Sequence, residues 1–292
     1  DDTNITGLGF KPDFVWIKQR GGTNNHLLIN SVQRRLTANT FLNSNNQNGD
    51  STDPNLLQSF NRDGFQIGTS SELNENSQNY VAWCWKAGGS SNTFNVDDVG
   101  YTSASAAGIT DGSIALTGAS INRDAGFSML LYTGTGSTGT VGHGLTKTPD
   151  IIITKSRSTT GSWAVLDRIG NPTAEYGLFL NDNGGYTSYQ GGTYWNDTLP
   201  TSTVFRVSSN AATNASGVTY VAYCWRSIPG YSKIGKYTGT GGSAGAYVYV
   251  GFRPAWVMFK RTDSGGNWFI VDSKRDSFNE CTRDLYPNNS NA

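Results

Sequence analysis

Two histidines are the residues best suited to general acid or base chemistry near neutral pH, because an imidazole titrates in that range. His26 lies in the apolar run "NNHLLIN", where two related segments of the chain carry tryptophan, so we expect it to pack inside a strand. His143 stands between glycines in "TVGHGL", and we expect it to form surface hydrogen bonds in a turn. No serine lies in a G-x-S-x-G motif. These residues do not predict catalysis.

Carboxylates could support a different chemistry, since a glycoside hydrolase needs two of them at one cleft. Glutamate is scarce, and Asp167 and Asp272 occupy a strand-end position that Asn30 fills in a related segment. An acid that an amide can replace is typical of a turn-forming hydrogen bonder. We therefore assign no catalytic residue, and a polysaccharide depolymerase is kept as the alternative of another class. The glutamates are Glu72, Glu75, Glu175 and Glu280.

The acidic loop "VDDVGYTSASAAGITDG" could gather Asp97, Asp98 and Asp111 around calcium. It lacks the alternation of ligands that an EF-hand loop has, so solvated loop acids are the preferred interpretation. We expect no metal and no cofactor.

An aromatic loop, "GGYTSYQGGTYWNDTLP" at residues 184–200, is the best candidate for ligand binding. Aromatic faces can stack on the C–H faces of a sugar, while amide and carboxylate groups bond its hydroxyls. Alternatively, these aromatic rings fold back over the protein or pack against a neighbouring subunit. The candidate glycan-binding residues are Tyr186, Tyr189, Tyr194, Trp195, Asn196 and Asp197.

Three cysteines are too few for a disulfide framework in 292 residues. Cys84 and Cys224 lie at matching places of a repeated phrase, and we expect all three, including Cys281, to be unpaired.

The composition excludes two classes of partner. Lysine plus arginine equals aspartate plus glutamate at 22 each, so the chain has no basic surface for nucleic acid. No apolar run is long enough for membrane insertion. Only 15% of residues are charged and 36 are glycine, which indicates short strands joined by polar turns.

Three blocks align without a gap, and each contains a proline, an apolar run ending in lysine, a polar turn and a second apolar run. This pattern predicts a β-hairpin in each block. We expect large buried fractions at Val15, Ile17, Leu28, Ile152, Val165, Val257 and Ile270. The blocks are "PDFVWIKQRGGTNNHLLINSV" at 12–32, "PDIIITKSRSTTGSWAVLDRI" at 149–169 and "PAWVMFKRTDSGGNWFIVDSK" at 254–274.

A second repeated phrase, "YVAWCW" at 80–85 and "YVAYCW" at 220–225, follows the first two blocks only. Its near-continuous apolar character predicts a central closing strand. The third copy lacks the phrase, so we expect residues beyond 292 or another chain to supply that strand.

The fold class we predict is all-β, with repeated antiparallel β-sandwich (jelly-roll-like) domains in a string. We expect a first repeat at residues 1–88, a linker excursion with lead-in strands at 89–131, a second repeat at 132–230 and a partial third repeat at 231–292.

The segments "GLGFKPDFVWIK", "YVAWCWKAGG", "GFSMLLYTGTGSTGTVGHGLTKTPDIIITKSR" and "YVAYCWRSIPGYSKIGKYTGTG" are similar to a known family. The chain resembles repeat-containing structural proteins of tailed bacteriophages, often from marine bacteria, whose repeat has no assigned function. The resemblance covers nearly the whole chain and carries no catalytic residues.

The resemblance implies a non-enzymatic protein on the virion surface. A tail fibre or other appendage with a host-contact or glycan-binding role is the favoured function, and a capsid-decorating protein that stabilises the particle is the alternative. It also implies other virion proteins as partners, a homo-oligomer, and a host surface glycan as ligand.

Overall fold

The computed structural model describes residues 2–186, 191–242 and 245–291. Strands dominate this part of the chain, with two short α-helices and one 3-10 turn, so the all-β prediction is confirmed. None of the described helices is long and apolar enough to cross a membrane.

The first copy consists of two antiparallel sheets, with strand orders β5-β4-β3-β2-β8 and β1-β7-β6. Val15 and Ile17 of the first sheet share a buried cluster with Phe65 and Ile67 of the second, which gives a sandwich-like pair of layers. The elements are β1 Thr3–Thr6, β2 Phe14–Gln19, β3 Leu27–Asn30, α1 Ser31–Leu36, β4 Thr40–Asn43, β5 Ser51–Thr52, β6 Leu57–Asn61, β7 Gly64–Ile67, α2 Ser71–Asn74 and β8 Tyr80–Trp85.

The second copy has a larger sheet with the order β10-β9-β11-β12-β18-β14-β15-β16, covered by the pair β13-β17. The lead-in strands expected within 89–131 are present, but the first half of that segment also pairs in the sheet through β9 and is not a free excursion. The elements are β9 Phe94–Val96, β10 Val99–Tyr101, β11 Leu116–Asn122, β12 Phe127–Thr133, β13 Gly139–Gly142, β14 Ile151–Ser156, β15 Ala164–Asp167, β16 Leu178–Phe179, η1 Gly191–Thr193, β17 Val204–Val207 and β18 Thr219–Trp225.

The third copy contributes one hairpin, formed by β19 (Trp256–Lys260) and β20 (Trp268–Asp272). Leu285 forms an isolated bridge with Ile270, where β16 pairs with β15 in the second copy. The third copy therefore repeats the inner part of the second one.

The three hairpins have one register, as the gapless alignment predicted. The matching pairs are Phe14 with Asn30, Ile151 with Asp167, and Trp256 with Asp272. Of the seven side chains predicted to be buried, Val257 alone is wrong, at 37% exposed. Its counterparts Val15 and Ile152 face an outer layer of strands, and no such layer covers β19 in the described part of the chain.

The repeated aromatic phrase forms the closing strand in both copies that contain it. β8 pairs with β2, placing Trp85 opposite Phe14, and β18 pairs with β14, placing Trp225 opposite Ile151. The prediction of a central strand is correct for β18, which lies between β12 and β14. It is wrong for β8, which is the edge of its sheet because no described strand takes the place of β12 there.

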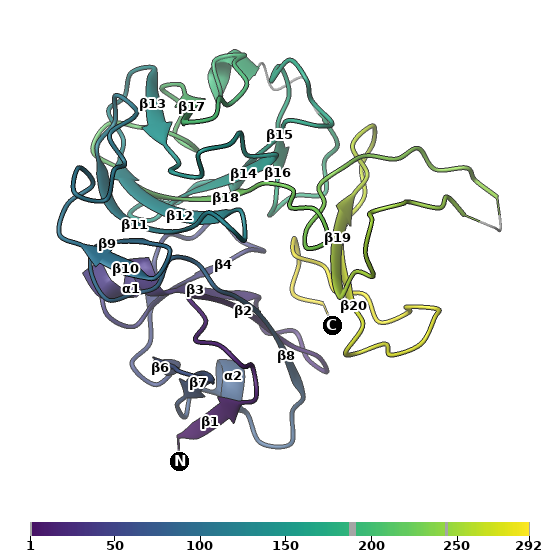
Figure 1. Ribbon diagram of the computed structural model, residues 1–292. Coiled ribbons are helices and arrows are strands. Elements are labelled where there is room, and N and C mark those ends of the chain that lie inside the picture. The colour runs from purple at the N-terminus through teal and green to yellow at the C-terminus, as the bar shows by residue number, and fades with distance from the viewer. Residues whose placement is uncertain (1, 187–190, 243–244, 292) are drawn as a thin grey trace.

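The hairpins pack around one shared core and do not form the predicted string (Figure 1). Leu28, Val165 and Ile270 occupy the same position of the three hairpins and belong to one buried cluster, each at most 2% exposed. The inner face of every hairpin contributes to this cluster. In a linear string, each repeat would have a separate core. Because one buried cluster is shared, the three copies pack together as one body.

Equivalent side chains connect the copies in a closed cycle. Trp163 of the second copy donates from Nε1 to the Asn43 carbonyl of the first at 2.9 Å. Trp268 of the third copy donates in the same way to the Phe179 carbonyl of the second at 2.9 Å. His26, the first-copy counterpart, faces the backbone of Tyr286 in the third copy. Each copy thus contacts the next through the same strand of its hairpin.

We predict that Trp163→Phe destabilises the protein more than Trp195→Phe does, by about 1 kcal/mol or more. Both indoles are fully buried, so both changes remove similar volume. Only Trp163→Phe leaves a buried carbonyl without its donor, because the Trp195 Nε1 has no hydrogen-bond partner among the described residues. Urea unfolding of the two variants measures the difference. Equal losses would mean that the hydrogen bond from Trp163 to the first copy does not stabilise the packing of the three copies around their shared core.

Candidate functional site

The aromatic loop is largely packed into the second copy. Trp195 is fully buried in the core between the two sheets of that copy, so its indole cannot serve as the exposed sugar platform that the sequence suggested. Tyr194 packs on the same core and meets the ring of Phe179 at 5.6 Å, edge to face. Burial removes the apolar surface of these aromatic rings from water. This agrees with the alternative interpretation of the sequence, in which the rings fold back over the protein.

Polar residues of the same loop form its turn. Asn196 and Asp197 adopt the left-handed backbone conformation, with φ of 52° and 46°. This conformation suits asparagine and aspartate, whose short side chains tolerate it. Tyr189 lies outside the described residues. The structure therefore does not gather the six candidates on one exposed face.

Tyr186 contacts the neighbouring copy. Its backbone N–H donates to the Thr262 carbonyl of the third copy at 2.5 Å, and its hydroxyl donates to Asp167 Oδ2 at 3.1 Å. Burial and the adjacent Asp167 carboxylate raise the pKa of the Tyr186 hydroxyl. The ring packs against the shared core, so Tyr186 is a contact between copies.

The recurrent strand-end acids cap turns, as predicted. Asp167 accepts from the backbone N–H of Ile169, and Asp272 accepts from those of Lys274 and Arg275. Asn30 caps α1 by accepting from the backbone N–H of Gln33.

Both histidines are buried. His143 was expected at the surface, but its side chain is inside, where Nδ1 accepts from the Leu145 N–H and Nε2 lies 3.2 Å from the Thr201 carbonyl. Burial lowers its pKa to about 4. His26 is a packing residue, as predicted, and its Nδ1 accepts from Trp16 Nε1 at 2.9 Å. Burial, aided by the charge of Lys18, lowers its pKa to about 3.

Repeated lysines are the buried groups whose role the sequence analysis missed. Lys18 and Lys155 are fully buried, and burial lowers the pKa of each to about 8. In all three copies the ammonium group donates to the carbonyl of the next residue, and Lys155 and Lys260 also donate to the neighbouring copy, at Gln47 and Asn183. Carbonyl acceptors around an enclosed ammonium group indicate a structural clamp. The signal was a lysine at one fixed position in every block.

Two of the three loop acids considered for calcium form ion pairs. Asp97 pairs with Arg123 and Asp98 with Lys86. Among the described residues there is no group of three histidine, cysteine or acidic side chains that could hold a metal ion. Cys84, Cys224 and Cys281 are free, in agreement with the sequence-based expectation.

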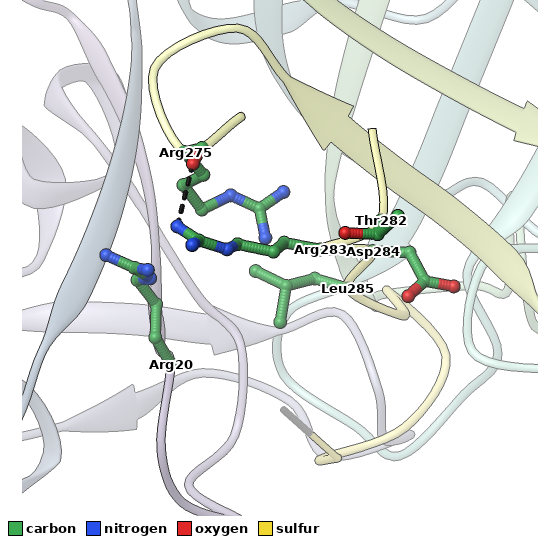
Figure 2. Close-up of a pocket in the computed structure, with 6 residues that line it drawn as sticks. All are labelled: Arg20, Arg275, Thr282, Arg283, Asp284 and Leu285. Carbon is green, nitrogen blue, oxygen red and sulfur yellow. Dashed lines mark hydrogen bonds between the residues drawn. The ribbon is translucent and has the colours of Figure 1, made fainter. Parts of the chain in front are cut away.

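A small arginine-lined hollow lies between the first and third copies (Figure 2). Its volume is about 250 Å³. Arg275 is engaged with Asp272, and Arg283 donates to the Arg275 carbonyl at 2.9 Å. The guanidinium group of Arg20 has no hydrogen bond or ion pair with any part of the chain that the structure describes, although its backbone N–H donates to Asn79. The lining residues are Arg20, Arg275, Thr282, Arg283, Asp284 and Leu285.

The hollow places the guanidinium groups of Arg20 and Arg283, the latter paired with Asp276, in one lining with Thr282 and the acidic Asp284. With its two arginines, the hollow suits an anionic group such as a carboxylate or sulfate. Its members come from opposite ends of the chain. No sequence pattern could have associated them.

A family model described as "Domain of unknown function (DUF7483)" matches residues 1–292. No curated protein and no solved structure matches the chain.

We predict that acid weakens the fold between pH 6.5 and about 4. Both histidines have folded-state pKa values below 6.5, so the unfolded chain binds more protons in this range. The free energy of unfolding is therefore highest above pH 6.5 and decreases as the pH falls, by about 1.4 kcal/mol per pH unit for each histidine.

The double variant Trp16→Ile with His26→Trp tests the share of His26, because it installs the pair that Ile153 and Trp163 form in the second copy. Its free energy of unfolding should depend less steeply on pH, by about one proton. His26→Trp alone is the control for overpacking. An unchanged slope in the double variant would show that His26 is not neutral in the fold.

Proposed function

We propose that this chain, which belongs to the DUF7483 family, is a non-enzymatic protein of a bacteriophage virion surface. The favoured role is in a tail fibre or other appendage that contacts the host. The observation that carries the proposal is the arrangement of three hairpins around one core, which joins the three similar blocks into one body. Rigid β modules with polar loops are suited to exposed particle surfaces. The virion location rests on the sequence resemblance described above.

The groups that could perform chemistry support a structural role. The histidines are neutral and buried, the lysines that recur at one position of the three blocks donate to carbonyls, and the strand-end acids cap turns. A hydrolase would instead need an exposed pair of carboxyl groups beside a cleft. We regard each complete repeat as a jelly-roll-like sandwich whose inner sheet faces the shared core.

Two other roles are compatible with the same body. A capsid-decorating protein would use the rigidity to stabilise the particle, with copies of the chain and other virion proteins as partners. A polysaccharide depolymerase would use a surface cleft on host glycan. The first differs from the favoured role in location and the second in chemistry.

The location is tested by electron microscopy of phage particles labelled with an antibody to this chain. We expect label on the tail or its appendages. Label distributed over the capsid would favour the decorating role, and particles without label would contradict a virion protein. Incubating the protein with host capsular or lipopolysaccharide glycan tests the third role, since only a depolymerase shortens the glycan.

If the host contact involves an anionic glycan, the arginine-lined hollow is the expected binding site. Replacing Arg20 and Arg283 with alanine should weaken binding to host cells at least tenfold at 0.15 M salt or lower, because both cationic groups are lost. The melting temperature should change by no more than a few degrees, since neither side chain belongs to the buried cores. Arg62→Ala, an exposed arginine elsewhere, is the matched control. Equal binding by all three proteins would remove the hollow from consideration.

A further inference from the structure

The third hairpin has the same construction as the other two, but within the described residues one of its edges has no partner strand. We propose that this free edge of β19 is a docking site for a single aromatic β-strand of the β8 and β18 type, supplied by a partner protein. The strand would run antiparallel to β19 and complete the third copy. This inference does not depend on the function proposed above.

The first argument is strand pairing. β2 and β14 each have a hairpin partner on one edge and an aromatic closing strand on the other. β19 pairs only with β20 within the described residues. The backbone N–H groups of Arg20 and Arg157 donate to the closing strands, at Asn79 and Thr219. Because alternate residues of a strand donate to the same side, Met258 and Lys260 direct their N–H groups to the free edge.

The second argument is burial at equivalent positions. Tyr132 and Ile152 are fully buried in the second copy, whereas their third-copy counterparts Tyr237 and Val257 are 56% and 37% exposed. The surrounding described residues, 231–242 and 245–250, form no strand and carry further exposed aromatic residues; Figure 1 draws them as extended backbone beside β19. An unpaired strand edge next to exposed apolar side chains is a template for strand addition. The exposed apolar residues are Tyr231, Tyr237, Tyr247, Val248, Tyr249 and Val257.

The third argument identifies the kind of strand. In each closing strand the fourth residue of the phrase reaches the strand end of another copy: Tyr223 accepts from Asn30 at 2.9 Å, and Trp83 donates to Asp272 at 3.1 Å. The equivalent acid on the second copy is Asp167, which faces the place where a third closing strand would lie. Tyr186 now donates to it. An aromatic residue with a polar tip is therefore what this position binds.

The fourth argument predicts the strength of docking. Asp13 accepts from the backbone N–H groups of Ala87 and Gly89, and Asp150 accepts from that of Ser227. In both copies a carboxylate therefore bonds the backbone just after the C-terminal end of the closing strand. The third copy has Ala255 at this position. A strand on β19 is thus held by backbone pairing and packing alone, which suits a reversible contact.

The test uses the full 292-residue chain and a fluorescent peptide with the sequence of residues 217–228, "GVTYVAYCWRSI", carrying Cys224→Ser to prevent oxidation. In the register of the other copies, Trp225 of the peptide lies opposite Trp256 and Tyr220 opposite Arg261. We expect saturable binding by fluorescence anisotropy. Binding should slow hydrogen exchange at the amides of Met258 and Lys260.

Two protein variants test the geometry in opposite directions. Met258→Pro removes an N–H at the free edge and should weaken binding at least tenfold, with Met258→Leu as the matched control. Ala255→Asp restores the missing carboxylate and should tighten binding several-fold, through a charge-assisted bond to the peptide N–H of Ser227. The gain-of-function variant keeps the test valid even if the proline variant folds poorly.

Several results would overturn the proposal. These are the absence of peptide binding, equal binding of a scrambled peptide, or no tightening by Ala255→Asp. A dimer of the chain that Met258→Pro dissociates would also contradict it, because the edge would then be occupied by a second copy.

Discussion

The hydrogen bond from a buried indole to a carbonyl of the next copy is the constraint on which the rest of the structure depends. An indole can donate only if the two hairpins approach closely, and the carbonyl is buried by the same approach. Equivalent contacts accompany this hydrogen bond at both interfaces where it occurs. The N–H groups of Gly161 and Gly266 donate to Gln47 and Asn183, the same carbonyls to which Lys155 and Lys260 donate. These two interfaces, between the second and first copies and between the third and second, are therefore aromatic at the centre and hydrogen-bonded to backbone carbonyls at the rim.

Packing of this kind gives a hairpin two buried faces. In β2, Phe14 and Trp16 face the shared core while Val15 and Ile17 face the outer layer. The strands consequently read as continuous apolar runs instead of alternating ones. Lys18 and Lys155, which end the first two runs, are buried as well, and their stems add to the packing while their ammonium groups bond carbonyls. Lysines, which could perform chemistry elsewhere, are used here to hold the copies together.

Self-similarity in the sequence predicted the hairpins, their register, the closing strands and the equivalence of Cys84 with Cys224. It could not predict the ring, because the acceptors of Trp163 and Trp268 are backbone carbonyls, which leave no mark in the sequence. The same limit applies to His143: flanking glycines predict a turn, but the Thr201 carbonyl that makes burial of the ring acceptable comes from a distant segment. Trp195 shows the complementary limit. Tyrosines, a tryptophan and glycines in one loop fit an exposed sugar-binding surface and a folded-back segment equally well, and only the structure shows that Trp195 packs in the core between the two sheets.

The exchange of acid and amide at the hairpin end follows from the partner that each residue meets. Asn30 donates from its amide to the hydroxyl of Tyr223, which can accept because a phenol both donates and accepts. Asp272 meets the indole of Trp83, which can only donate, so an acceptor is required there. Asp167 meets the hydroxyl of Tyr186, which donates to it. A proton donor in catalysis could not be exchanged for an amide without losing its chemistry, whereas a hydrogen-bond partner can be, as Asn30 and Asp167 show by each meeting a tyrosine hydroxyl. The variation between copies is thus itself evidence that this position was fitted to the contact between repeats.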